Sequence, residues 1–210
     1  YGAQPAAYAP APVGGALGAA RQIQNNHQNP AALRQELVAT LNEGAGGDLV
    51  GPNQVRKLDQ YLAQMQPGQL ESLKGLVNAA STRAEQIFIL KAFAANEPWA
   101  NLVQFAAEMR GRSEDEIIRR CTMRDGSDVV QQWQDACGPT MLQAAAGEVD
   151  PRFAWELNKT WDISAIDPLG NNSAVAQQQK QWLEAFGGRA VQRGQSGGTG
   201  IAIGDMLNQL

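Results

Sequence analysis

The chain has 210 residues and a hydrophobic content of 43%, which suffices for a core in one domain of ordinary size or in two small ones. Its formal net charge of −4 argues against a nucleic-acid-binding protein, a class that usually carries a basic surplus. No apolar run approaches the ~18–20 residues that a membrane span requires, so we expect no membrane-spanning segment.

The N-terminal segment, residues 1–28, is predicted to be a flexible or polyproline-like lead outside any core. Residues 1–20 are nearly all Ala, Gly, Pro and Tyr and carry no charge. The single histidine, His27, lies in the amide-rich stretch that follows. We interpret it as a surface residue rather than as a ligand or a base.

Residues 29–123 are predicted to form a bundle of short amphipathic helices. Apolar residues recur at intervals of three and four along the whole stretch, which is the spacing of one helix face. Capping residues and prolines mark six helix starts, namely Asn29-Pro30, Pro52, Pro67-Gly68, Thr82 with Glu85, Asn96, and Ser113 with Glu116. The apolar stripes are predicted to be core, so we interpret this half as a packing or docking module.

Several residues that carry chemistry in other proteins are predicted to be structural here. The arginines between positions 110 and 124 alternate with acidic residues, which is typical of a solvated helix face with ion pairs. Cys121 lies on the apolar face of a predicted helix and is interpreted as a small buried residue. Asp162, Asp167 and Asp205 are scattered without the spacing of metal ligands, so we expect no metal and no cofactor.

A turn cluster at residues 124–128 is predicted to begin a second part, residues 124–210. Helices are expected at about 138–146, ending at Gly147, from Asp150-Pro151 onward, and from Ser173 to Phe186. Trp155 and Trp161 are interpreted as core residues rather than groove-lining ones, and residues 177–179, all Gln, as solvated.

The glycine-rich stretch at residues 194–200 is predicted to be a surface loop. It lacks the Gly-Lys-Ser/Thr ending of a phosphate-binding loop, and no strand pattern precedes it. A last amphipathic segment follows, with apolar residues at Ile201, Ile203, Met206, Leu207 and Leu210.

The strongest chemical signal is Cys137, which opens the run Cys137-Gly138-Pro139-Thr140 at the start of a predicted helix. A helix N-terminus favours the thiolate through its unpaired N–H groups and the positive end of the dipole. Gly138 permits close approach of the backbone to a substrate carbonyl. Gln131 could donate a hydrogen bond to an oxyanion formed at this thiol. Gln132 and Gln134 compete for that role, and the sequence does not separate the three.

Gln131 followed by Cys137-Gly138-Pro139-Thr140 resembles the active-site segment of papain-like cysteine peptidases. Within them it is most similar to the bacteriocin-processing, double-glycine leader peptidases and their relatives. The resemblance covers about residues 125–210, with the specific motif confined to residues 131–140. It implies Cys137 as the nucleophile and Gln131 as the oxyanion-hole residue. It also implies a mostly α chain, in which the bundle is followed by the helical half of a papain-like α+β fold.

The chain departs from the family pattern because the catalytic His and Asp or Asn, which the family places downstream on a sheet, have no counterpart before Leu210. Three explanations stay open. The sequence is a fragment cut between the two halves of the fold, a second chain supplies the sheet and the histidine, or the thiol is inactive and the fold serves binding.

The resemblance implies a thiol hydrolase that cleaves peptide or isopeptide bonds through a thioester on Cys137. Its expected partners are a protein or peptide substrate and, under the second explanation, another chain; nucleic acid is not expected. A secreted or translocated bacterial protein is the favoured setting. The alternatives are a glutamine deamidase or transglutaminase-like effector and a non-enzymatic helical adaptor.

Overall fold

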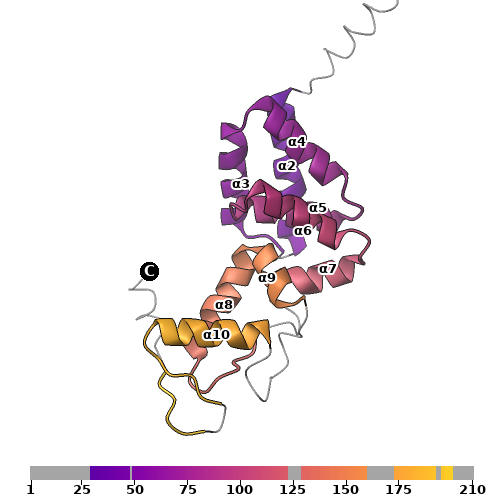
Figure 1. Ribbon diagram of the computed structural model, residues 1–210. Coiled ribbons are helices and arrows are strands. Elements are labelled where there is room, and N and C mark those ends of the chain that lie inside the picture. Colours follow the sequence, from indigo (N-terminus) through magenta and orange to yellow (C-terminus); the bar gives the residue numbers. More distant parts are fainter. Residues whose placement is uncertain (1–28, 48, 123–128, 160–172, 193–194, 201–210) are drawn as a thin grey trace, which may run out of the picture.

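The computed structural model describes residues 29–47, 49–122, 129–159, 173–192 and 195–200. Within these ranges the chain forms nine α-helices and one short 3-10 helix, and its only β-type pairing consists of isolated bridges. Figure 1 shows the helices of residues 30–109 at one end of the molecule and the helix of residues 174–185 at the other, with the helices of residues 114–121 and 151–157 side by side between them. The predicted predominance of helix is confirmed for these residues.

The six helices predicted for residues 29–123 are all found. They are α2 (Pro30–Glu43), α3 (Pro52–Gln64), α4 (Pro67–Asn78), α5 (Arg83–Ala94), α6 (Trp99–Met109) and α7 (Glu114–Cys121), with the 3-10 turn Gly44–Gly47 after α2. The second part contains α8 (Cys137–Val149), α9 (Pro151–Leu157) and α10 (Ala174–Ala185).

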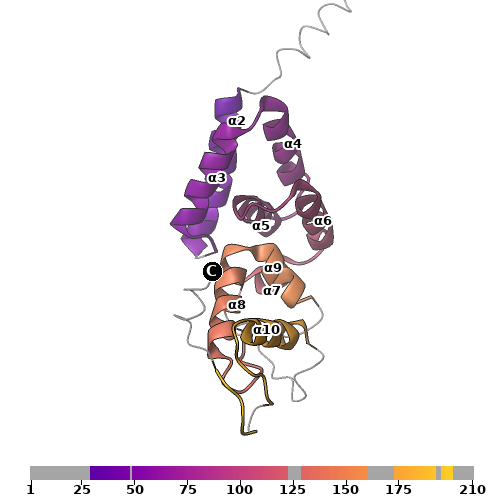
Figure 2. The same cartoon turned by 60° about the vertical axis from the view of Figure 1, so that its left-hand side comes forward.

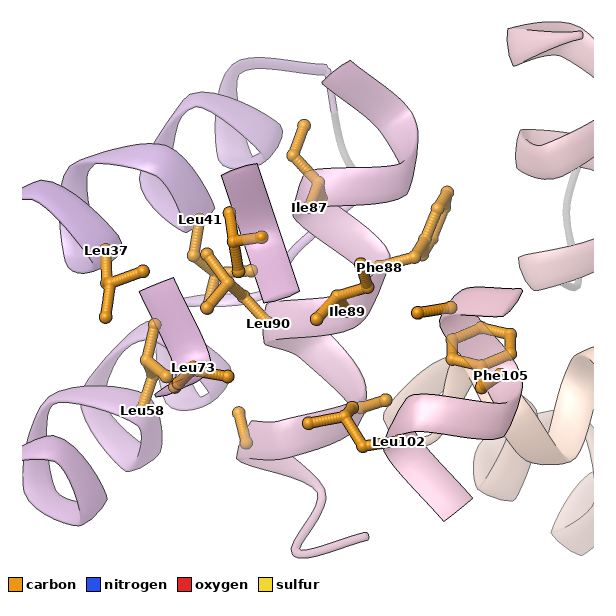
Figure 3. Packing of buried hydrophobic residues seen from close by; sticks show 14 of the residues in the cluster. Leu37, Leu41, Leu58, Leu73, Ile87, Phe88, Ile89, Leu90, Leu102 and Phe105 are labelled. Atoms are coloured by element: carbon orange, nitrogen blue, oxygen red, sulfur yellow. The ribbon is translucent and has the colours of Figure 1, made fainter. Parts of the chain in front are cut away.

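Helix α5 is the central element of the bundle. Nine of its twelve residues are buried, as expected for a helix that is apolar nearly all the way round. It packs against α2, α3, α4, α6 and α7, and Figure 2 shows it lying across the space between the α2/α3 pair and α4. Leucines from three helices, Leu41, Leu58 and Leu73, point toward it in Figure 3. The predicted stripes are therefore core.

Side-chain caps explain where several helices begin. The Thr82 hydroxyl accepts from the backbone N–H of Glu85 at 3.1 Å, and the Ser113 hydroxyl accepts from that of Glu116 at 3.2 Å. Both bonds satisfy a donor that has no partner inside the helix.

The start predicted at Asn96 is wrong. Helix α6 begins at Trp99 with Pro98 before it, and Asn96 has a φ of 70°. A residue that precedes proline is driven away from helical geometry, so Glu97 cannot continue a helix that began at Asn96. Asn96 instead takes the left-handed conformation, which asparagine tolerates better than most residues, and reverses the chain after α5.

Helix α8 is longer than predicted, because Gly147 does not end it. Gly147 is buried inside the helix, which runs to Val149. The actual stop is Asp150-Pro151: proline disfavours helical geometry at Asp150, and the Asp150 side chain then accepts from the N–H of Arg152 at 2.9 Å to cap α9. One aspartate therefore ends α8 and begins α9.

Trp155 on α9 fastens the second part of the chain to the bundle. Its side chain is fully buried and belongs to the same apolar cluster as the leucines of α2–α5. The indole meets Phe105 edge-on, with 5.8 Å between ring centroids, and its N–H donates to a carboxylate oxygen of Glu108 at 2.9 Å. The prediction that Trp155 is core is confirmed, and the cluster extends beyond the predicted bundle.

The arginines of α7 and the loop before it do more than pair with acids. Arg112 and Arg120 both bind the Glu116 carboxylate, at 2.7 and 3.0 Å, as the interleaved charges predict. Both guanidinium groups also lie over the Trp155 ring, 5.2 and 5.3 Å from its centroid. This arrangement adds cation–π attraction to the burial of the indole.

No helix in the described ranges is long and apolar enough to cross a membrane. The predicted boundary at residues 124–128, the N-terminal lead at residues 1–28 and Trp161 lie outside the described residues.

Candidate functional site

Cys137 is the first residue of α8, and its side chain is exposed as a free thiol. Ala136 precedes it at the cap position and offers no side-chain hydrogen bond to the helix end. The first turn of a helix leaves its N–H groups without partners inside the helix, and Pro139 has no N–H to contribute. The N–H groups of Cys137 and Gly138 therefore remain as the donors of this turn, next to the sulfur.

The other thiol is in the opposite environment. Cys121 is fully buried at the end of α7, and burial raises the pKa of its thiol well above the ordinary value because an anion is disfavoured away from water. The interpretation of Cys121 as a buried structural residue is confirmed.

A buried network of glutamines holds the segment 129–136 that leads into Cys137. The amide of Gln179 on α10 accepts from the backbone N–H of Gln132 at 2.8 Å and donates to the carbonyl of Val130 at 3.0 Å. The same amide nitrogen donates to the Gln143 side chain on α8 at 3.0 Å. Gln143 and Gln179 are both completely buried. The Gln179 side chain thus connects the segment 129–136 to α10 and, through Gln143, to α8.

The prediction that the glutamines at residues 177–179 are solvated is therefore wrong for Gln179. The apolar periodicity of α10 gives no sign of it, because Gln179 satisfies backbone groups of a distant segment. A buried amide is tolerated only when its donors and acceptor are paired, and the segment 129–132 provides those partners.

Trp133 anchors the same segment a second time. Its indole N–H donates to the carbonyl of Ala176 at 2.6 Å, and the Lys180 ammonium lies 5.5 Å from its ring centroid. Its backbone forms an isolated antiparallel bridge with Gln192, next to a hydrogen bond from the Gln134 N–H to the carbonyl of Val191 at 3.0 Å. The chain before Cys137 and the chain after α10 thus lie side by side.

The three candidate oxyanion donors have different surroundings. Gln131 is half-buried, and its side-chain amide donates to the carbonyl of Trp133 at 2.8 Å. Gln132 is buried. Gln134 donates to the carboxylate of Asp135 at 3.2 Å. Burial disfavours Gln132, and the assignment of Gln131 stays a prediction.

Asp135 makes the sharp turn that precedes the cysteine helix. Its φ of 58° is in the left-handed region, which aspartate tolerates better than most residues. The glycine-rich stretch passes directly against it: a Cβ added at Gly200 would lie 2.7 Å from the Asp135 carbonyl oxygen. A Cβ at Gly198 would lie 3.5 Å from its carboxylate. The approach to Asp135 therefore requires glycine at position 200, whereas a Cβ at Gly198 would be in ordinary contact with Asp135 and would instead meet a Val191 methyl at 2.8 Å. The predicted surface loop forms one edge of the site.

The described residues provide no general base of the expected kind. His27 is the only histidine of the chain and lies outside the described ranges, as do Asp162, Asp167 and Asp205. Among the residues that the structure describes, no group of three His, Cys, Asp or Glu side chains is placed to hold a metal ion. What the arrangement provides is an exposed sulfur, two backbone donors and a fixed entry segment.

No protein-family model, curated protein or solved structure matches this chain.

Proposed function

We propose that Cys137 is the nucleophile of a thiol hydrolase that acts on peptide or isopeptide bonds. The observation that carries the proposal is the exposed sulfur at the first residue of α8, where the N–H groups of Cys137 and Gly138 have no partner within the helix. An exposed thiol in this position suits a nucleophile, since the sulfur is accessible and two backbone N–H donors lie beside it.

In the proposed reaction, the Cys137 thiolate adds to the carbonyl carbon of the scissile amide. Negative charge develops on the carbonyl oxygen, where the Cys137 N–H and the Gln131 amide would donate hydrogen bonds. The C–N bond breaks as the leaving amine takes up a proton, and a thioester remains on the sulfur. Water then adds to the thioester and gives a proton back to the group that protonated the amine, the C–S bond breaks, and the thiolate and a carboxylic acid are released.

Because the only histidine of the chain, His27, lies outside the described residues, we propose that the proton for the leaving amine comes from a group outside those residues, on this chain or on a second one. A deamidase would use the same steps on a glutamine side chain and release ammonia, so the two activities differ in product. Conversion of Gln to Glu without chain cleavage would identify the deamidase.

A non-enzymatic binding module is the second candidate, and one feature of the bundle favours it. A cavity of about 460 Å³ opens between α3, α4, α5 and α6, lined by Met65, Gly68, Gln69, Ser72, Phe93 and Trp99. Trp99 is 46% exposed and Val103 is 41% exposed one helical turn further along α6. An exposed aromatic residue beside an apolar cavity is typical of docking surfaces.

Alkylation by iodoacetamide tests the nucleophile. We expect Cys137 to react at pH 7 about tenfold faster than an exposed thiol in a loop, because two backbone N–H donors without partners in the helix lie beside its sulfur. The matched control is Ser196→Cys in a Cys137→Ser background, which places an equally exposed thiol in a loop. Mass spectrometry of the two proteins gives the rates, and equal rates would remove the basis of the proposal.

A further inference from the structure

The outer face of α8 carries one row of exposed, uncharged side chains. Cys137, Met141, Ala145 and Val149 are exposed, whereas the other residues of the helix are buried or half-buried. The four lie at intervals of four residues and form a single ridge along the helix. Met141 is 59% exposed and Val149 48%, so two large apolar side chains face away from α9 and α10. We call this row the α8 ridge.

The chain itself supplies a segment that fits the α8 ridge. Gly200 is the last described residue, and its Cα lies so near Asp135 that an added Cβ would be 2.7 Å from the Asp135 carbonyl oxygen. Asp135 precedes the first residue of α8 by two positions. Residues 201–210 therefore start at the end of the helix where the ridge starts.

The sequence of residues 201–210 has the complementary pattern. Ile203, Met206, Leu207 and Leu210 recur at the spacing of one helix face, and Asp205 is the only charged residue of the ten. Eight helical residues span about 12 Å at ~1.5 Å per residue, which matches the length of ridge between Met141 and Val149. Two apolar faces of equal length, joined at one end, bury each other at a low cost in loop entropy.

We propose that residues 201–210 dock on the α8 ridge and cover Met141, Ala145 and Val149. The proposal does not depend on the proposed catalytic function, because it follows from the exposure of the ridge and the position of Gly200. A second copy of the chain is the competing occupant.

Disulfide trapping in the full chain distinguishes the two. The variant combines Cys137→Ser with Ala145→Cys and Leu207→Cys, and Cys121 stays in place because it is fully buried. Under mild oxidation we expect an intramolecular disulfide, seen as a monomer of altered mobility on a non-reducing gel. The matched control replaces Ala145→Cys by Val103→Cys, at the 41% exposed position on α6, and is expected to form no such bond. Equal trapping in both pairs, or disulfide-linked dimers alone, would overturn the proposal.

A second measurement does not depend on disulfide geometry. In the Cys137→Ser background we expect a thiol at Ala145→Cys to react with maleimide about tenfold faster after Leu207→Asp, since a buried charge would undock the segment. Circular dichroism verifies that both proteins are folded. An unchanged rate would mean that residues 201–210 do not cover the ridge.

Discussion

At the scale of single residues, Asp150 is a half-buried residue whose carboxyl has a shifted pKa. Its carboxyl pKa is raised to about 6, because burial disfavours the charged form and because it shares a hydrogen bond with Glu97. Glu97 also binds Arg152 at 3.4 Å and Asn101 at 2.9 Å. The aspartate that separates α8 from α9 is thus held against the bundle by a second carboxylate.

The raised pKa makes stability depend on pH. The Asp150 carboxyl binds its proton more tightly in the folded protein than in the unfolded chain, where its pKa is 3.8. Its contribution to the free energy of unfolding is therefore fully present below pH 3.8. It is lost as the pH rises through about 6. We expect Asp150→Asn, which keeps the cap, to increase the free energy of unfolding at pH 7.5 by about 1–2 kcal/mol after allowance for solvent screening.

Urea unfolding of both proteins at pH 7.5 and pH 3.5 measures the effect. At pH 3.5 the two should be equally stable, because the wild-type carboxyl is then protonated in the folded state. Asp115→Asn on the exposed face of α7 is a control that should leave the difference between the two pH values unchanged. If Asp150→Asn stabilised the protein equally at pH 7.5 and at pH 3.5, the raised pKa of Asp150 would be contradicted.

At the scale of elements, one side chain of α10 fixes the segment before the cysteine helix. Gln179 bonds both the N–H of Gln132 and the carbonyl of Val130, and it reaches Gln143 on α8. The position of Cys137 relative to the chain after α10 therefore depends on the buried side-chain amide of Gln179.

Gln179→Leu tests this dependence. Leucine has a similar size but leaves the buried backbone groups of the segment unpaired, at a cost of about 1–3 kcal/mol. We expect the amide of Gln132 to exchange with solvent faster in hydrogen-exchange measurements, whereas amides of α5 change little. Gln181→Leu, at an exposed position of the same helix, is the matched control and should leave the segment protected. Equal protection in all three proteins would show that other contacts hold it.

Much of the element structure can be predicted from the sequence, and the misses have physical reasons. Proline, Ser and Thr caps predict local events, so Pro52, Pro67, Thr82 and Ser113 mark starts that the structure confirms. The end predicted at Gly147 is wrong because Pro151 decides where α8 ends, and the start predicted at Asn96 is wrong because Pro98 decides where α6 begins.

The site is less predictable than the helices. Cys137 begins a helix as predicted and is exposed, and its role as nucleophile stays a prediction. Gln179 and the glycines beside Asp135, in contrast, contact residues far away in the sequence. Local patterns do not encode such contacts, so the network that holds the site is visible only in the folded chain.

At the scale of the whole molecule, Trp155 couples the two parts. Its ring is buried in the bundle core between Arg112, Arg120 and Phe105. Trp155 itself lies on α9, which belongs to the second part of the chain together with α8. Bonds from the Gln54 amide to the carbonyls of Glu148 and Val149, at 3.2 and 3.0 Å, add a second connection. We therefore expect the described parts to unfold together.

Trp155→Ala should break this coupling. The loss of a buried tryptophan costs about 3–5 kcal/mol and removes one of the hydrogen-bond donors to the Glu108 carboxylate. We expect the wild type to unfold in one transition with the same midpoint by circular dichroism and by hydrogen exchange of α5 and α10. In the variant, α10 should lose protection at a lower urea concentration than α5. Trp99→Ala, at a 46% exposed site, should keep the transitions coincident, and coincident transitions in Trp155→Ala would contradict the coupling.

The two cysteine thiols, Cys121 and Cys137, report whether the protein is folded. Cys121 is sealed and Cys137 is open, so a reagent that reaches only surface thiols adds one label to each intact molecule. A second label appears only on molecules whose bundle has opened. The number of labels per chain therefore reports the fraction of opened molecules in any preparation, without knowledge of a substrate.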